Sequence, residues 1–359
     1  MNSKDITRYI PKVKAKGAVV DPGDFVFAAA YLDHGHIYGQ VGGLLEAGGI
    51  CKYVHDPDPY KVKDFTRRFP GVKPITDINV ILQDKDIKLV AAAGIPDTRG
   101  RAGVNVMEHG KDYFVAKTPF TTLSQLDEAR QTSAKTGRKY MVYYSERLHC
   151  ESAVYAGQLV QDGAIGDVVQ ITGIGAHRLN ASTRPSWFFN REQYGGILCD
   201  IGSHQAEQFL YYSGAKDATV LHSKVGNYSN PQYPELEDFG DATMVADNGV
   251  SGYFRVDWFT PNGLSGSAGD GRLFILGTKG AIEVRKFVNV GHDNKGDHVF
   301  LYNETDEVHI HVSGKVGCPF FGDLILDCIN RTENAMTQEH AFKAAELCLL
   351  AQEKAMKIC

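Results

Sequence analysis

The sequence predicts an α/β protein with two domains: a doubly wound parallel sheet, then an α+β domain on a large, mostly antiparallel open sheet. The chain has 359 residues, more than a single hydrophobic core usually organises. Up to residue 145, apolar runs alternate with helical segments, which is typical of a parallel sheet covered by helices. From residue 146, β-rich runs follow one another with short glycine turns. We therefore expect domains at 1–145 and 146–359.

The first domain is predicted to begin with a strand, a tight turn and a helix, since FVFAAAY (25–31) is apolar and 37–49 is amphipathic. The next strand, 50–54, stops at two prolines, and Asp58 can cap a helix over 61–69. Further helices are predicted at 78–84, 100–110 and 123–136, and further strands at 87–96, 112–119 and 139–145.

The second domain is predicted from β-rich runs at 167–177, 218–229, 241–259 and 272–286. Between the first two lies GILCDIGSHQAEQFLYYSG (196–214), which predicts a helix with Asp200, His204 and Glu207 on one face. The tail from residue 320 is predicted to be helical and amphipathic.

The composition excludes several classes of function. The net charge of −5 comes without a concentrated basic face, so nucleic acid is not an expected partner. No run approaches the roughly 18 apolar residues of a membrane span, and the seven cysteines contain no C-x-x-C pair, so we expect reduced thiols and a cytoplasmic location. His309 and His311 alternate on a strand without a third ligand, and no metal site is expected.

The turn after the first strand is a candidate cofactor site. Rossmann domains use glycines here so that the backbone can approach a pyrophosphate. In this chain Tyr31 and Asp33 occupy the places of the first two glycines, and Asp33 would repel phosphate. Asp56 ends the second strand, where a carboxylate can bind an adenosine ribose, which favours NAD over NADP. The alternative is that Asp33 caps the helix and His34 and His36 are ordinary turn residues.

Three residues are candidates for chemistry. Hydride transfer at a carbinol carbon needs a group that exchanges the hydroxyl proton, and Lys117 and His204 qualify. Lys117 ends a buried strand at its carboxyl edge, and Asp200 lies one turn before His204, where it could orient the imidazole. A solvated strand end and a structural pair are the alternatives. Trp187, a neighbouring aromatic, could stack on a sugar or belong to a hydrophobic lid.

The sequence resembles the Gfo/Idh/MocA family over nearly its whole length. The resemblance is carried by GKDYFVAKTPFTTLSQL, DGAIGDVVQI, RPSWFFNREQYGGILCDIGSHQAEQF and ILGTKGAIEV. It implies that Lys117 touches nicotinamide ribose and substrate, and that His204 is the general acid/base beside Asp200. The chain departs from the family pattern at Ala116 and Thr118, where glutamate and proline are usual.

The resemblance implies an NAD(P)-dependent oxidoreductase that acts on a secondary hydroxyl of a sugar, glycoside or cyclitol. An open sheet face commonly pairs with a copy of itself, so we expect a homodimer or homotetramer. A glycosidase or lyase with tightly bound NAD, and a non-catalytic sensor, are the alternatives. The expected cofactor contacts are Leu32, Asp33, His34, Gly35, His36, Ile37, Asp56, Ile95, Pro96 and Lys117. The expected substrate contacts are Arg147, His177, Arg178, Trp187, Tyr194 and His204.

Overall fold

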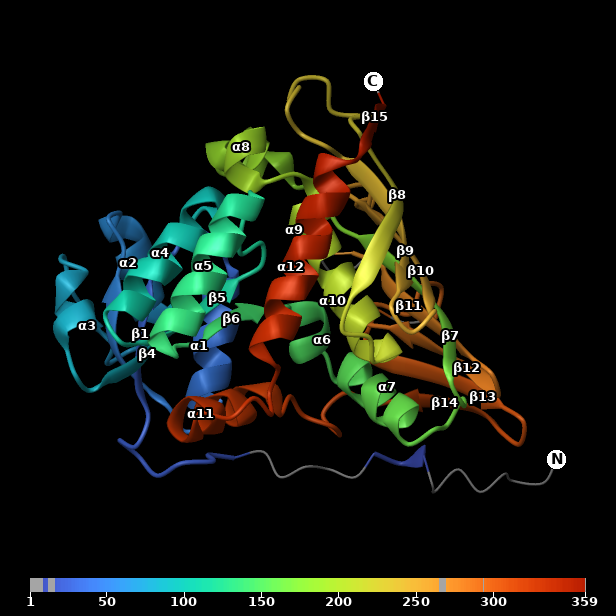
Figure 1. Cartoon of the computed structure of the whole chain (residues 1–359), viewed down its shortest axis with the longest axis horizontal. Coiled ribbons are helices and arrows are strands. Elements are labelled where there is room, and N and C mark those ends of the chain that lie inside the picture. Colours follow the sequence, from blue (N-terminus) through green and yellow to red (C-terminus); the bar gives the residue numbers. More distant parts are fainter. Residues whose placement is uncertain (1–8, 12–16, 265–268, 293, 359) are drawn as a thin grey trace.

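The protein consists of two sheets with helices packed on them (Figure 1). The computed structural model describes residues 9–11, 17–264, 269–292 and 294–358. A six-stranded sheet has the order β3-β2-β1-β4-β5-β6, and a nine-stranded sheet has the order β14-β13-β12-β11-β7-β10-β9-β8-β15. The predicted fold class is therefore confirmed. The domain boundary at 145/146 stays a prediction, and it falls at the start of a short helix, α6 (Ser145–Leu148).

The first sheet is parallel throughout. Its strands are β1 (Val26–Ala30), β2 (Ile50–His55), β3 (Lys73–Pro74), β4 (Ile87–Ala92), β5 (Asp112–Ala116) and β6 (Tyr140–Tyr143). Its helices are α1 (His36–Glu46), α2 (Pro59–Arg68), α3 (Asn79–Gln83), α4 (Pro96–Glu108) and α5 (Leu123–Thr136).

Local sequence explains where these elements begin and end. Strands β5 and β6 are buried at every residue, as expected for a parallel sheet with helices on both faces. Asp58 caps α2 by accepting a hydrogen bond from the Tyr60 amide (2.8 Å), as the sequence predicts. Thr122 caps α5 in the same way, and α5 ends at Gly137 with φ of 64°.

The second sheet is mostly antiparallel, with two parallel pairs, β7–β10 and β8–β15. Its strands are β7 (Val168–Ala176), β8 (Ala218–Gly226), β9 (Phe239–Ala246), β10 (Ser251–Asp257), β11 (Gly271–Gly277), β12 (Gly280–Arg285), β13 (His298–Asn303), β14 (Glu307–His311) and β15 (Met356–Ile358). The remaining helices are α7 (Glu151–Gln161), α8 (Arg191–Tyr194), α9 (Ile197–Asp200), α10 (Gly202–Ser213), α11 (Phe320–Asn330) and α12 (Gln338–Glu353).

Helices α7, α10 and α12 cover one face of this sheet, and its other face is open in Figure 1. Helix α12 also packs against α5 and β6 of the first sheet, so the C-terminal tail joins the two halves. The helix predicted over 196–214 is interrupted: α9 ends at Asp200 and α10 begins at Gly202.

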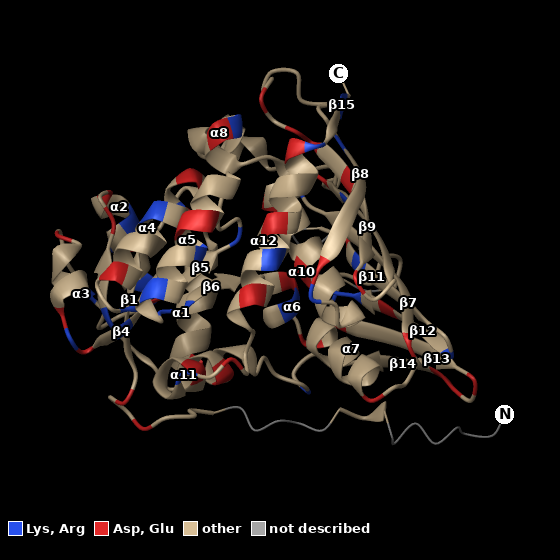
Figure 2. Ribbon diagram, in the orientation of Figure 1, with Lys and Arg blue, Asp and Glu red and all other residues tan. Residues whose placement is uncertain are grey.

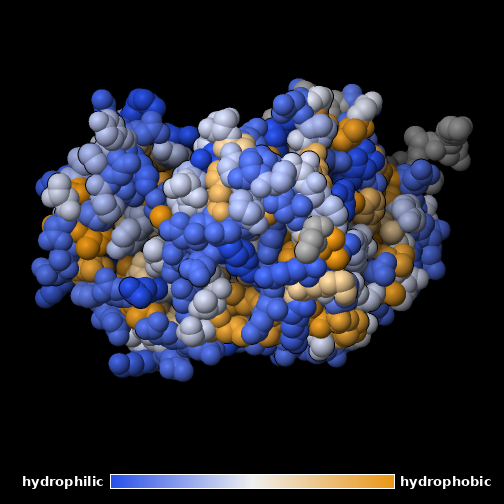
Figure 3. Space-filling model, turned by 90° about the horizontal axis from the view of Figure 1, so that it is seen from above, coloured by the Kyte–Doolittle hydropathy of each residue, from blue (hydrophilic) through white to orange (hydrophobic). Residues whose placement is uncertain are grey.

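The surface carries mixed charges. Figure 2 shows acidic and basic residues interspersed along α5 and α12, in keeping with the absence of a basic face in the sequence. Seen from above, hydrophobic residues reach the surface in separate patches between larger hydrophilic areas (Figure 3). In the part of the chain that the structure describes, no helix is long and apolar enough to cross a membrane.

Candidate active site

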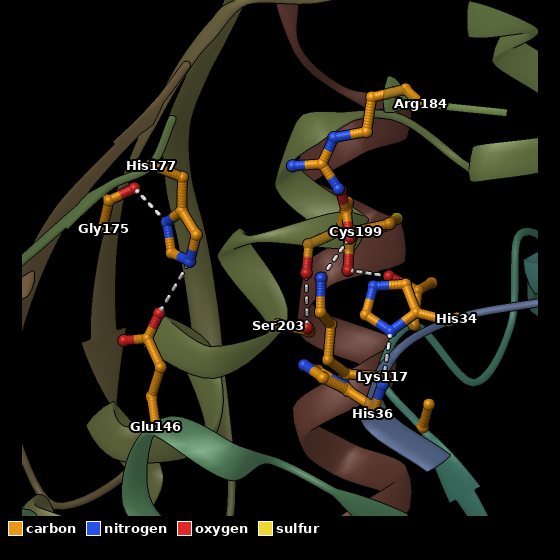
Figure 4. Close-up of polar contacts among 12 residues, drawn as sticks. His34, His36, Lys117, Glu146, Gly175, His177, Arg184, Cys199 and Ser203 are labelled. Carbon is orange, nitrogen blue, oxygen red and sulfur yellow. Dashed lines mark hydrogen bonds and ion pairs between the residues drawn. The ribbon is translucent and has the colours of Figure 1, made fainter. Parts of the chain in front are cut away.

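A buried ion pair lies where the carboxyl edge of the parallel sheet meets α9. Lys117 follows β5 directly, and its Nζ donates to Oδ1 of Asp200, the last residue of α9. Only 6% of Lys117 and 9% of Asp200 is exposed. Burial alone would raise the pKa of Asp200, but the charge and hydrogen bond of Lys117 lower it. Asp200 is therefore ionised at neutral pH. Figure 4 shows Lys117 beside two imidazoles, those of His34 and His36.

A buried arginine shapes the backbone that carries Lys117. The Arg99 guanidinium, 1% exposed, donates to the carbonyl oxygens of Gly94 (2.6 Å), Lys117 (2.5 Å) and Thr118 (2.9 Å). The Thr118 hydroxyl, which stands where the family has proline, donates to the Cys199 carbonyl oxygen. The Lys117–Thr118 peptide bond is cis. Arg99 and Thr118 thus tie together the ends of β4, β5 and α9 around the ion pair.

His204 lies on α10 with a neutral imidazole. Burial, opposed by the charge of Glu146, lowers its pKa to about 3, and its Nδ1 is buried without a hydrogen-bond partner. The prediction that Asp200 orients this ring is wrong, because Asp200 binds Lys117 instead. Nor do Asp200, His204 and Glu207 act as one polar face, because Asp200 pairs with Lys117 and Glu207 pairs with Arg147, while Nδ1 of His204 has no hydrogen-bond partner. The helix is also interrupted at Ile201.

A second buried carboxylate belongs to the site, and sequence reasoning missed it. Oε2 of Glu146 accepts hydrogen bonds from Lys286 Nζ and from Gln205 Nε2 (3.1 Å), while Oε1 lies 3.6 Å from His177 Nε2. Figure 4 shows the contact between Glu146 and His177. Burial would raise the pKa of Glu146, but Lys286 and the two histidines hold it well below its usual value. The signal was present: Glu146 comes directly after the last predicted strand, at the same sheet edge as Lys117.

The turn after β1 is built without the first two glycines of the fingerprint. Tyr31 takes the left-handed conformation, with φ of 56°, that glycine would adopt there. The Leu32 amide donates to Asp56 Oδ2 (2.6 Å), and the Asp58 amide donates to Asp56 Oδ1 (2.9 Å). Asp33 pairs with Lys61 at 2.5 Å. The carboxylate that would repel phosphate is thus accompanied by a cation.

The start of α1 faces the imidazoles. The His36 amide donates to His34 Nδ1 (3.1 Å), and burial lowers the pKa of both rings. The His36 ring lies 6.2 Å from the His204 ring, between centroids, and its Nδ1 is buried without a hydrogen-bond partner. Ile37 is a core residue, 1% exposed, so the structure leaves its side chain no cofactor contact. Pro96 opens α4, and Ile95 precedes it at the carboxyl side of β4.

These residues fit a nicotinamide dinucleotide at its nicotinamide end. Unpartnered imidazole nitrogens of His36 and His204 and the ammonium of Lys117 gather at the carboxyl edge of the sheet, where doubly wound folds bind ligands. At the adenosine end, Asp56 gives both oxygens to backbone amides, and Lys61 lies 3.8 Å from it. The preference for NAD therefore stays a prediction.

Two predicted substrate contacts are structural aromatics. Trp187 is 8% exposed and Tyr194 is 1% exposed, both in a cluster with Phe188 and Trp258. The Tyr194 hydroxyl donates to the Glu235 carbonyl oxygen (3.2 Å) and accepts from the Glu237 amide (3.0 Å). These rings pack in a buried aromatic cluster, which favours the alternative of a hydrophobic lid, and their prediction as sugar-stacking residues stays a prediction.

Two predicted arginine contacts are also structural. Arg147 Nε donates to Glu207 Oε1 (2.6 Å), and its guanidinium lies 4.0 Å from the Tyr211 ring. Arg178 donates to Pro261 and Leu264 carbonyl oxygens (2.7 and 2.6 Å) and so holds the loop after β10. Among the predicted substrate contacts, His177 and His204 remain at the site.

A third arginine, Arg184, was not predicted. Its guanidinium lies 4.5 Å from the Phe188 ring and 5.0 Å from the Trp258 ring, and its charge helps lower the pKa of Asp200. Far from this centre, His298 Nδ1 and His309 Nε2 are 2.8 Å apart, and His311 stacks on His298. Among the described residues, no three His, Cys, Asp or Glu side chains are arranged to hold a metal ion.

The fold and the site define the class. A parallel sheet with a ligand edge, an open antiparallel sheet and a lysine, carboxylate and histidine centre between them are features of two-domain oxidoreductases. Residues 154–283 match the GFO/IDH/MocA C-terminal domain. The crystal structure of a protein designated an oxidoreductase from Erwinia carotovora atroseptica is 48% identical and superposes with a TM-score of 0.91, covering 94% of this chain and 100% of that one. The chain belongs to the Gfo/Idh/MocA family.

Two curated relatives are more distant. A D-xylose dehydrogenase from Paenarthrobacter nicotinovorans is 23% identical over 208 residues, which span 56% of this chain and about half, 52%, of that enzyme. A scyllo-inositol 2-dehydrogenase (NAD(+)) from Bacillus subtilis is 24% identical over 263 residues, 72% of each chain.

Proposed function

We propose that the protein is an NAD(P)-dependent oxidoreductase that transfers a hydride between the cofactor and a secondary hydroxyl of a sugar, glycoside or cyclitol. The observation that carries this proposal is the buried Lys117–Asp200 ion pair beside the neutral imidazole of His204, at the carboxyl edge of β5. The names of the two curated relatives, a D-xylose and a scyllo-inositol dehydrogenase, support the substrate class.

The residues divide the work as follows. The bound nicotinamide supplies the hydride acceptor or donor. Lys117 keeps one N–H on Asp200 and has two further hydrogens for the substrate oxygen, which fixes the hydroxyl and stabilises negative charge on it. His204 is unprotonated, because burial lowers its pKa, and so can accept the hydroxyl proton. Asp200 is a positioning residue, since it holds the ammonium rather than the imidazole.

We propose that the cofactor is NAD, because Asp56 lies at the end of β2, where a carboxylate can bind the adenosine ribose. Lys61 contacts Asp33 and lies 3.8 Å from Asp56, so its ammonium is a nearby cation that can bind a phosphate group. Fluorescence titration with NADH and NADPH separates the two cofactors. A substrate-dependent rise of NADH absorbance with a panel of aldoses and inositols tests the reaction. If neither cofactor binds at millimolar concentration, the proposal fails.

The turn around Asp33 favours one other candidate, a non-catalytic sensor that keeps the fold. Tyr31 and Asp33 stand where glycines usually let the backbone approach a pyrophosphate. If wild-type protein does not bind NADH and Asp33→Gly does, the sensor is favoured. Binding by the wild type supports the enzyme.

We also propose that the protein is a homodimer or homotetramer in which the open face of the nine-stranded sheet meets a second copy. Exposed apolar side chains lie on strands β10, β11 and β13 of that sheet: Tyr253 (38%), Phe274 (37%), Leu276 (46%) and Tyr302 (58%). Light scattering coupled to size-exclusion chromatography tests it, and Phe274→Lys with Leu276→Lys should give a monomer. The cytoplasmic location stays a prediction.

A further inference from the structure

A cavity lies at the amino edge of the parallel sheet, on the side opposite to the catalytic residues. It has a volume of about 440 Å³, and small-molecule sites commonly span about 300 to 1,000 Å³. Its walls are the end of α5, the turn before β6, the loop between α11 and α12, and the start of α12. Figure 1 shows α5 and α12 side by side, with α11 below them. The cavity therefore lies where the two halves of the protein meet, and its lining contains no residue expected to contact cofactor or substrate.

Four basic side chains line this cavity, and carboxylates neutralise two of them. Arg331 donates two hydrogen bonds to Asp112 (2.6 and 3.0 Å). Arg130 pairs with Glu339 (3.1 Å) and with Glu346 (2.9 Å). In the part of the chain that the structure describes, the other two basic side chains have no carboxylate within ion-pair distance.

The first of these two, Lys139, is a buried cation. Only 6% of the residue is exposed, and its ammonium donates to the Thr332 carbonyl oxygen. An ammonium has three N–H groups, and no second acceptor among the described residues bonds to this one. Buried charges are nearly always paired, because removing an unpaired charge from water is costly. Lys139 therefore lacks a counter-ion, which a ligand in the cavity can supply.

Lys111 shows how such a lysine is satisfied without a ligand. It directly precedes β5, as Lys139 precedes β6, and only 4% of it is exposed. Its ammonium donates to the carbonyl oxygens of Asp84 (2.6 Å) and Ile87 (3.2 Å), and it does not line the cavity. The two lysines thus share a sheet edge and a degree of burial, and they differ in the number of acceptors and in the cavity beside Lys139.

The second cation, Arg138, is partly exposed and lines the cavity. Its amide donates to Thr136 Oγ1 (3.2 Å), and its carbonyl oxygen accepts from the Ser133 hydroxyl (2.7 Å), so its backbone is fixed. Its guanidinium has no hydrogen-bond partner among the described residues. Glu333 also lines the cavity, but it is exposed, and water and salt screen its charge.

The wall opposite to these cations is held by a buried carboxylate. Asp327 is 1% exposed, and its Oδ1 accepts from the Thr332 hydroxyl (2.6 Å) and the Asn334 amide (2.9 Å). Its Oδ2 accepts from the Ala335 amide (2.8 Å). The loop that carries the Thr332 carbonyl oxygen is therefore rigid, and the cavity is formed before any ligand binds.

The chemistry of the two cations selects the ligand. A guanidinium binds two oxygens at once in its plane, and an ammonium binds a further oxygen as a point charge. A phosphate monoester carries a charge of about −1.5 to −2 at pH 7 and has three acceptor oxygens, so one such group can bind to both cations. A monocarboxylate has a single charge and two oxygens. Phe342 adds an apolar wall for the carbon atoms of an ester.

We infer that Arg138 and Lys139 form a binding site for a phosphate group, which belongs to inorganic phosphate or to the monoester of a small metabolite. The bound group supplies the counter-ion of Lys139 and links the turn before β6 to the loop before α12. The site is separate from the active site, so the inference does not depend on the proposed function.

Isothermal titration calorimetry of the full chain at pH 7.5 and constant ionic strength tests the inference with inorganic phosphate, glycerol 3-phosphate and acetate. At least one of the two phosphates should bind at least tenfold more tightly than acetate. Tighter binding of glycerol 3-phosphate assigns the site to a monoester, and equal binding assigns it to the phosphate group alone. Arg138→Gln and Lys139→Met should each weaken phosphate binding at least tenfold. Lys111→Met, which also removes a buried lysine from this sheet edge, is the matched control and should leave the affinity unchanged.

The two variants together keep the test decisive. Lys139→Met leaves the Thr332 carbonyl oxygen without its donor and can lower stability, whereas Arg138→Gln changes a partly exposed residue and should remain folded. Phosphate binding no tighter than acetate binding would overturn the inference. Unchanged affinity in Arg138→Gln and in folded Lys139→Met would place the phosphate elsewhere, for example at the cofactor turn, and would also overturn it. An equal loss in Lys111→Met would show that the charge of the sheet edge, and not this cavity, governs binding.

Discussion

Replacing Lys117 by methionine separates what the ion pair does for folding from what it does for chemistry. The substitution keeps the length of the side chain but leaves Asp200, 9% exposed, as an unpaired buried charge. Breaking one side of a buried pair costs about 3–5 kcal/mol, whereas replacing both partners with apolar residues is often neutral. We therefore expect Lys117→Met to be strongly destabilised, and Lys117→Met/Asp200→Leu to recover most of the loss. Both variants should lack activity, since neither can hold the substrate oxygen.

Urea unfolding followed by tryptophan fluorescence measures the effect. Both tryptophans, Trp187 and Trp258, lie in the aromatic cluster of the second domain, so the signal reports on the domain that carries Asp200. With an m-value of about 1–3 kcal/mol/M, the single variant should lower the urea midpoint by about 1 M or more. Lys216→Met, which removes a cation from an exposed loop of the second domain, is the control. A double variant as unstable as Lys117→Met would refute the idea that the unpaired carboxylate causes the loss.

Other substitutions test the remaining assignments. His204→Asn should lower kcat by roughly 10² to 10⁴, the usual loss for a general base, with little change in NADH affinity; an unchanged kcat would move the base elsewhere. The pKa of His204 is about 3 in the folded protein and about 6.5 in the unfolded chain. The unfolded chain therefore binds a proton between these values and the folded protein does not, so stability falls as the pH drops from 6.5 toward 3. Urea midpoints measured at pH 7.5 and 5 should differ less in His204→Asn than in the wild type. Arg147→Met removes one of the two partners of the buried Glu207 carboxylate and leaves His340, whose Nε2 lies 3.1 Å from Oε1, so it should cost up to about 3–5 kcal/mol while kcat of the folded enzyme is retained. A specific rise in KM would restore Arg147 as a substrate contact. Asp33→Asn removes the carboxylate next to the expected phosphate position and frees Lys61 from its ion pair. One screened charge contributes about 1 kcal/mol, so calorimetry should show that NADH binds about fivefold more tightly. Weaker binding would show that the carboxylate stabilises the turn.

The order of strands and helices could be predicted because it depends on local patterns. Prolines stop β2, Asp58 caps α2, and fully apolar runs give the buried strands β5 and β6. The rule that ligands bind at the carboxyl edge of such a sheet was enough to select Lys117. Its contact with Asp200, 83 residues later in the chain, was not predicted, because no local pattern joins the two residues.

The errors come from partners that lie far apart in the sequence. The sequence predicts Arg147 as a substrate contact, whereas its guanidinium meets Glu207 at a separation of 60 residues, and no local pattern gives that pairing. The sequence predicts Tyr194 as a sugar-stacking residue, whereas its hydroxyl bonds to the backbone of residues 235 and 237. Helical spacing predicts that Asp200 faces His204, but the Asp200 carboxylate pairs with Lys117, and Nδ1 of His204 has no hydrogen-bond partner.

The charge of Glu146 affects the basicity of His204. A base whose pKa is about 3 is weak at neutral pH, since proton transfer is most efficient when the pKa of the base is close to the pH. The charge of Glu146 opposes the burial that lowers the pKa of His204, because a nearby carboxylate favours the imidazolium. Glu146 thus restores part of the basicity of the ring that would accept the hydroxyl proton.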